Sequence, residues 1–204
     1  NLRYWVFTVD NRYGIVDPRY VLLTEEDLWY PVAGIPYGSA FPVVGKRDFI
    51  HFTLKVKTRP DYTAISQGSV GSSSPGEFEF VPESPLPQIS LVIGKYQKRS
   101  ITAEGIDYSL YILPEHDYFS NYFDLIGDQF GTILDEIMFN YEKQINLTYS
   151  FPRMSIVETP IQFTSHERSW KAARDIIQPE QIFLPEKGVL LRSADFKMSS
   201  SWSQ

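Results

Sequence analysis

The chain has no cysteine among its 204 residues. This absence excludes a thiol nucleophile, a disulfide framework and any metal site with cysteine ligands. Histidine is scarce as well, since His51, His116 and His166 are its three occurrences. A site that needs several imidazoles therefore has few residues from which to be built.

Long hydrophobic runs and an excess of basic residues are also missing. No run approaches the roughly 20 apolar residues of a membrane-spanning helix, and no signal peptide is recognisable. The sequence has 19 Lys and Arg against 25 Asp and Glu, a net charge of −6, and no basic stripe. We therefore expect no nucleic-acid partner. The chain begins at Asn1 rather than Met, and we expect a processed or excised segment of a longer protein.

What is abundant points to a folded, β-rich protein. The hydrophobic fraction is 43% and the aromatic fraction 15%, with 13 Tyr and 14 Phe, which favours pleated sheets over a helical bundle. In 49–57, apolar residues alternate with polar ones, the pattern of an antiparallel strand with one buried face. Shorter candidate strands are 4–9, 20–24, 77–81 and 89–93. The Gly/Ser-rich stretch 67–76 predicts a mobile hairpin connection.

The second half has a different character. Apolar residues in 117–143 recur every three or four positions, which predicts a long helix with one core-facing stripe. The stripe consists of Phe119, Tyr122, Phe123, Ile126, Phe130, Ile133, Leu134, Ile137, Met138 and Tyr141. We expect strands at 108–113, 154–159, 181–184 and 189–191, and a shorter helix at 165–177.

These patterns predict two domains. The first, 1–98, is mainly β, an antiparallel sandwich or saddle. The second, 99–204, is the opening part of an α/β domain. The boundary is expected within 97–100, and no internal repeat is found.

Several motifs occur in the order typical of one family. They are Trp29-Tyr30-Pro31 through Pro36, the strand 49–57 closed by Pro60, Ile65-Ser66-Gln67-Gly68 and Val92-Ile93-Gly94-Lys95-Tyr96. In this order they resemble the N-terminal β domain of aminopeptidase N-like zinc metallopeptidases. The later segments 108–113, 119–142, 150–152 and 154–160 are similar to the opening of that family's thermolysin-like catalytic domain.

The family's substrate-anchoring segment is missing. In the family, the strand that corresponds to 154–160 leads to Gly-Ala-Met-Glu-Asn, whose Glu holds the free amine of the substrate. After Pro160 this chain instead continues Ile161-Gln162-Phe163-Thr164. The resemblance leaves Glu158, His166 and Glu167 as candidate substrate-binding residues, and it gives no catalytic residue.

The zinc-binding motif is also absent. Zinc sites of this family need two His at i and i+4, with a Glu beside the first. At 166–170 the chain has His166 and Glu167, but Trp170 stands where the second His is required. His51 and His116 have no partner at ligand spacing, so we expect no metal site in this segment. Trp29 and Tyr30 could line a groove, but aromatics beside a proline turn more often fill a core.

The resemblance implies the non-catalytic front portion of an aminopeptidase N-like metallopeptidase, which shapes access to a zinc site outside this segment. Its partners would be the rest of the parent peptidase, membrane-embedded segments of the same chain and peptides. Some bacterial relatives attach such a domain to a transporter-type permease, which implies an extracytoplasmic, membrane-tethered location. The alternative is a degenerate peptidase-like binding or scaffolding module of a transporter-associated protein.

Overall fold

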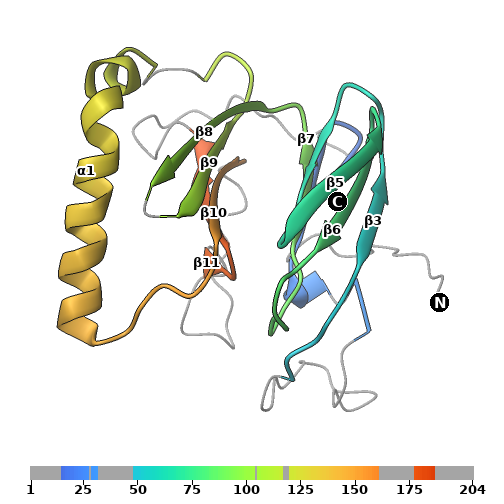
Figure 1. The fold of residues 1–204 in the computed structure, drawn as a ribbon. Coiled ribbons are helices and arrows are strands. Elements are labelled where there is room, and N and C mark those ends of the chain that lie inside the picture. The colour runs from blue at the N-terminus through green and yellow to red at the C-terminus, as the bar shows by residue number, and fades with distance from the viewer. Residues whose placement is uncertain are drawn as a thin grey trace, which may run out of the picture.

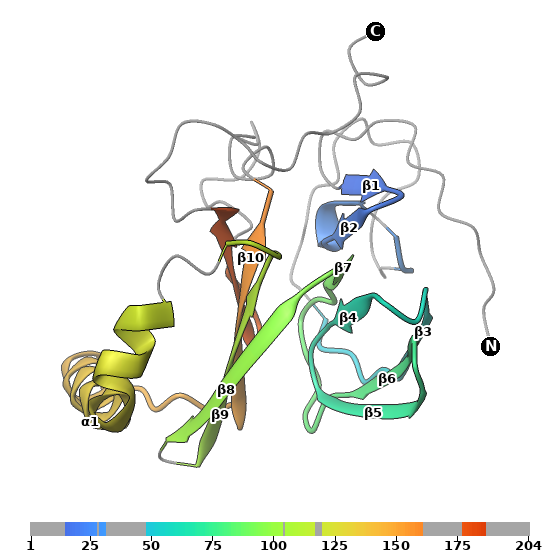
Figure 2. The same ribbon diagram turned by 90° about the horizontal axis from the view of Figure 1, so that it is seen from above.

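The structure is a computed structural model, and it describes residues 15–27, 29–31, 48–103, 105–116, 120–160 and 177–186. These residues form three β-sheets, one long α-helix and a short 3-10 helix, so the architecture is mainly β as expected. The largest sheet lies between the helix on one side and the two smaller sheets on the other (Figure 1, Figure 2). The expected strands at 4–9 and 189–191, and the expected second helix up to residue 176, lie outside the described residues.

The two smaller sheets are antiparallel, and together we call them the β module. The four-stranded sheet has the order β1-β2-β7-β4; its strands are β1 (Ile15–Asp17), β2 (Tyr20–Leu23), β7 (Leu91–Gly94) and β4 (Thr63–Ile65). The 3-10 helix η1 (Glu25–Asp27) follows β2. The three-stranded sheet has the order β3-β6-β5; its strands are β3 (Leu54–Lys57), β6 (Glu77–Val81) and β5 (Ser69–Ser74).

A buried apolar cluster fills the β module. Its members are Leu23, Trp29, Tyr30, Val56, Ala64, Phe80, Ile89 and Leu91. Trp29 and Tyr30 are 6% and 8% exposed, and the Tyr30 hydroxyl accepts a hydrogen bond from the Ile89 N–H at 3.1 Å. The two aromatics therefore fill the core and do not line a groove.

The alternation in 49–57 determines which side chains join this cluster. Ile50, Phe52 and Leu54 are half-buried and Val56 is buried, whereas the intervening residues are exposed. The paired strand is shorter than expected and starts at Leu54, because only Ile50 pairs before it, as an isolated bridge to Leu86.

The Gly/Ser-rich stretch is a strand, and our expectation of a mobile connection was wrong. β5 pairs antiparallel with β6, with a register irregularity between Gly71 and Ser74. The connection between them is only Pro75-Gly76, and Gly76 has a positive φ of 81°. Pairing with the strongly alternating β6 gives this stretch its conformation, although its own residues have low strand propensity.

The largest sheet is mixed, with the order β11-β12-β10-β9-β8. Its strands are β8 (Gln97–Ala103), β9 (Ile106–Ile112), β10 (Arg153–Thr159), β11 (Ile177–Gln178) and β12 (Gln181–Pro185). β9, β10 and β12 are parallel, and each edge strand is antiparallel to its neighbour. Helix α1 (Ser120–Ile145) connects β9 to β10, so these three elements form a β-α-β unit.

Helix α1 forms where it was expected, but part of its apolar stripe does not face the core. Ile133, Ile137 and Tyr141 are 41%, 48% and 64% exposed. Toward the sheet, the helix instead brings Asp135 and Glu142 near Tyr108 of β9. Burial first, and then these two carboxylates, raise the pKa of the Tyr108 hydroxyl. For these three residues the expectation of a core-facing stripe was wrong.

A second buried cluster joins the β module to the mixed sheet. The β module contributes Tyr20, Leu22, Ile65 and Val92, and the mixed-sheet half contributes Tyr111, Leu113, Val157 and Phe183.

The boundary expected within 97–100 falls inside β8, and the division at residue 98 stays a prediction. Among the helices that the structure describes, none is long and apolar enough to cross a bilayer.

Candidate functional site

Three buried polar residues lie at or just beyond the carboxyl ends of the parallel strands of the mixed sheet. His116 lies after β9, Glu158 is the penultimate residue of β10, and Glu186 follows β12. They are 8%, 7% and 1% exposed. Because the carboxyl ends of parallel strands meet at one edge, where open α/β sheets commonly bind ligands, this edge is the first candidate site.

Glu158 is held by two hydrogen bonds inside the protein. Its Oε1 lies 2.8 Å from His116 Nδ1, and its Oε2 accepts the Leu113 N–H at 2.7 Å. The His116 N–H in turn donates to the Leu113 carbonyl oxygen at 3.1 Å. Glu115, which lies in the chain between Leu113 and His116, has a positive φ of 68°. With Pro114 before it, this is the geometry of a type II turn, which places the imidazole beside the carboxylate.

Two tyrosines of the β-rich half contact the same part of β10. The Tyr96 hydroxyl lies 2.7 Å from both the Tyr20 hydroxyl and the Glu158 carbonyl oxygen. Burial is the main cause that raises the pKa of both hydroxyls well above their usual range. They therefore remain neutral hydrogen-bond donors at any ordinary pH, and they attach the end of β10 to the first half of the chain.

Of the three candidate substrate-binding residues, only Glu158 is described. It lies at the carboxyl edge as a buried partner of His116, whereas His166 and Glu167 lie outside the described residues. No spacing in the sequence indicated a partner for His116, because Glu158 is 42 positions away. The available signal was that both residues lie near the ends of the two strands of one β-α-β unit.

The described residues do not fit a zinc site. In the part of the chain that the structure describes, no three His, Asp or Glu residues are grouped so that they could hold a metal ion. His116 and Glu158 contribute one imidazole and one carboxylate, and these are bonded to each other. A tetrahedral zinc site needs at least three protein ligands.

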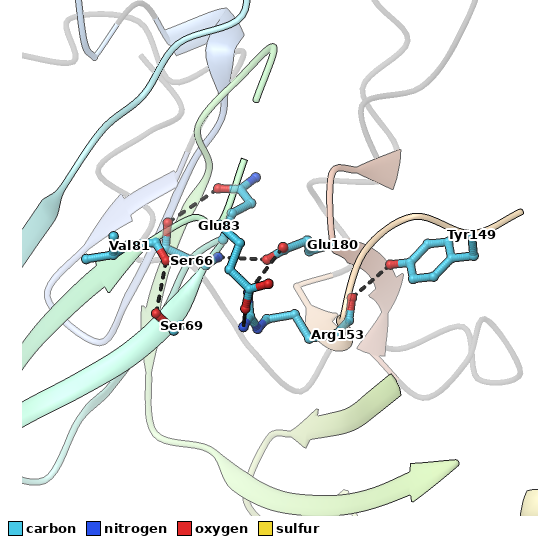
Figure 3. A network of polar contacts seen from close by, with 9 residues as sticks. Ser66, Ser69, Val81, Glu83, Tyr149, Arg153 and Glu180 are labelled. Atoms are coloured by element: carbon cyan, nitrogen blue, oxygen red, sulfur yellow. Dashed lines mark hydrogen bonds and ion pairs between the residues drawn. The ribbon is translucent and has the colours of Figure 1, made fainter. Parts of the chain in front are cut away.

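A second polar cluster joins the two halves at the other end of β10. Arg153 lies 3.2 Å from Glu180 through Nη1 and 2.8 Å from Glu83 through Nη2. Glu180, with a positive φ of 60°, also accepts the Gly68 N–H at 2.7 Å through Oε2. Figure 3 shows the Arg153 side chain beside the Glu83 and Glu180 carboxylates, with the Tyr149 hydroxyl bonded to the Arg153 backbone. This cluster has the geometry of a structural connection between the halves.

No family model matches the sequence, and neither does any curated protein. Among solved structures, the chain is similar to an aminopeptidase N family protein from Idiomarina loihiensis, with 14% sequence identity and a TM-score of 0.49. The alignment covers 92% of this chain and 28% of that protein, so the chain spans less than a third of the neighbour's length. A likeness of this strength assigns neither a family nor an activity to the chain.

Proposed function

We propose that this chain is the non-catalytic front portion of an aminopeptidase N-like zinc metallopeptidase. Its β module would act as a lid whose contribution is steric and positional. The mixed sheet and α1 would be the first part of a thermolysin-like body, whose zinc ligands lie in sequence outside these residues. The location proposed with it is extracytoplasmic, tethered to a membrane through the parent protein.

The buried interface between the β module and the mixed sheet is the observation that carries the proposal. Tyr20 and Leu22 of the β module share a buried cluster with Val157 and Phe183 of the mixed sheet. Side-chain hydrogen bonds cross the same interface, including Gln88 to Gln178 at 2.6 Å and Ser90 to Gln181 at 2.5 Å. A module attached over such a buried surface can shape access to a neighbouring site without supplying chemistry.

Enzyme assays on two proteins test the proposal. The 204-residue chain is expected to leave aminoacyl p-nitroanilides intact and to contain no stoichiometric zinc by metal analysis. The parent protein is expected to hydrolyse them and to lose activity with a chelator. Chelator-sensitive hydrolysis by the chain itself would overturn the non-catalytic assignment. Proteolysis of the parent in intact cells tests the proposed location, since an extracytoplasmic portion must be cleaved from outside.

The alternative, a peptidase-like scaffolding module without chemistry, is favoured by the environment of Glu158. Its carboxylate is bonded to His116 and to the Leu113 N–H, instead of being presented to a substrate amine. The parent sequence distinguishes the two. A His-Glu-x-x-His with a Glu about 20 residues further on supports the peptidase, and its absence supports the scaffold.

A further inference from the structure

The two faces of the mixed sheet differ in polarity. Side chains alternate along a strand, so Tyr108 and Leu110 of β9 point toward α1, whereas Asp107, Ser109 and Tyr111 point toward the β module. A parallel sheet covered on both faces is normally apolar on both. The polar part of the inner face therefore requires an explanation.

Four polar residues lie side by side across this inner face. Ser109 of β9 is in register with Ser100 of β8 and with Ser155 of β10, and Ser155 is in register with Gln181 of β12. We call these four residues the polar row. By the same register, Lys98 and Tyr111 lie on one side of the row, and Asp107 and Arg153 lie on the other.

A cavity of 250 Å³ separates part of this face from the β module. From the sheet it is lined by Lys98, Ser109 and Ser155, together with neighbouring residues, and across from them lie Gly68 and Phe80 of the β module. At about 30 Å³ per water, the volume corresponds to roughly eight waters. This space suits a small polar group.

The ammonium group of Lys98, which lines the cavity, has no carboxylate partner within the described part of the chain. Its Nζ lies 5.6 Å from the centre of the Tyr111 ring, and no described carboxylate is within ion-pair distance. By contrast, Arg153 at the other end is paired with both Glu83 and Glu180. The cavity is therefore most favourable for negative charge at its Lys98 end.

We propose that this cavity binds a small oxyanion, the group shared by carboxylates and phosphates. The Lys98 ammonium would provide the charge, and Ser109 and Ser155 would donate hydroxyl hydrogen bonds from the polar row. Asp107 on the far side of the row would orient the ligand, because it repels a second negative group.

Isothermal titration calorimetry of the full chain tests this proposal, with inorganic phosphate and acetate as separate arms at low ionic strength. Saturable binding in either arm supports the site, and the tighter arm identifies the oxyanion source. Lys98→Gln is expected to weaken binding by about tenfold, the effect of losing a charge-assisted hydrogen bond. Ser155→Ala is expected to weaken it by about fivefold, the effect of losing a neutral one.

Lys143→Gln is the matched control, since it removes one exposed lysine charge from α1, away from the cavity. It should bind the anion within about twofold of the wild type, as expected for a screened distant charge. Circular dichroism confirms that each variant is folded. No saturable heat in either arm, or equal affinity in the Lys98→Gln and Lys143→Gln variants, overturns the proposal.

Discussion

Glu158 and His116 are both buried, and each bonds the other at 2.8 Å. A buried carboxylate is tolerated only where its charge and lone pairs are satisfied, and here His116 and the Leu113 N–H satisfy them. The same pairing that makes Glu158 compatible with burial also occupies the atoms that would hold a substrate amine. At the scale of single residues, the Glu158–His116 pair at the carboxyl ends of the parallel strands therefore serves to stabilise the fold.

Removing the Glu158 carboxylate should therefore destabilise the fold. Glu158→Ala leaves the Leu113 N–H and the His116 imidazole buried without this acceptor, and we expect the free energy of unfolding to fall by about 3 kcal/mol. Urea unfolding followed by circular dichroism measures the loss. Glu79→Ala, which removes a partner of Lys55 in an exposed pair, should change stability by less than about 1 kcal/mol. Equal effects of the two substitutions would contradict the structural role of Glu158.

Asp17 gives a prediction about pH. Its hydrogen bond with the Arg19 side chain is the main cause that lowers the pKa of the Asp17 carboxyl below 3.8. A carboxyl with a lowered folded-state pKa stabilises the protein above its unfolded pKa, and this stability is lost as the pH falls through the folded pKa. Because the Arg19 side chain is 52% exposed, the contribution should be below about 1 kcal/mol.

Asp17→Asn should accordingly lose less stability than the wild type between pH 5 and pH 2. Thermal unfolding at several pH values measures the difference. Arg19→Gln should flatten the same curve, because it removes the group that lowers the Asp17 pKa. If both variants track the wild type across this range, the pair makes no contribution.

Individual elements depend on a few glycines. Gly68, just before β5, has a φ of 95°, and a Cβ there would lie 2.4 Å from the Pro82 nitrogen. Its N–H also donates to Glu180 of the other half. Gly131 in α1 is different, since a Cβ there would meet nothing within 4 Å.

Alanine at these two positions should therefore have opposite effects. Gly68→Ala should destabilise the protein by more than about 2 kcal/mol, because backbone must move and the residue is strained. Gly131→Ala should stabilise it by up to about 1 kcal/mol, because alanine has the higher helix propensity. Chemical unfolding measures both, and a stable Gly68→Ala variant would show that the contact with Pro82 relaxes easily.

Some of these elements could be predicted from the local sequence pattern alone. Strict alternation located the buried face of 50–56, and a three-to-four spacing located α1. β5 was missed because serine and glycine have little strand propensity, and its partner β6 supplies the order. β8 was missed because its residues, from Gln97 to Thr102, include few apolar side chains, and its antiparallel pairing with β9 defines it.

At the scale of the whole molecule, the shared cluster should make the two halves unfold together. Phe183 of β12 is fully buried against Tyr20 and Leu22 of the β module. Phe183→Ala should reduce the free energy of unfolding by about 3–5 kcal/mol. Hydrogen exchange of the Leu22 and Val92 amides should be faster in this variant than in the wild type, although both residues lie in the β module. Unchanged protection of these amides in the variant would show that the halves are energetically independent.

The sequence by itself determined the β-rich class, the long helix, the absence of cysteine chemistry and the failure of the zinc motif at Trp170. Each of these follows from residue type or from spacing within one segment. Tertiary structure alone decided that His116 bonds Glu158, that serines from three strands form one row with Gln181, and that Ile133 and Ile137 remain exposed. Such features depend on strand register and on packing between segments far apart in the chain, which no local pattern encodes.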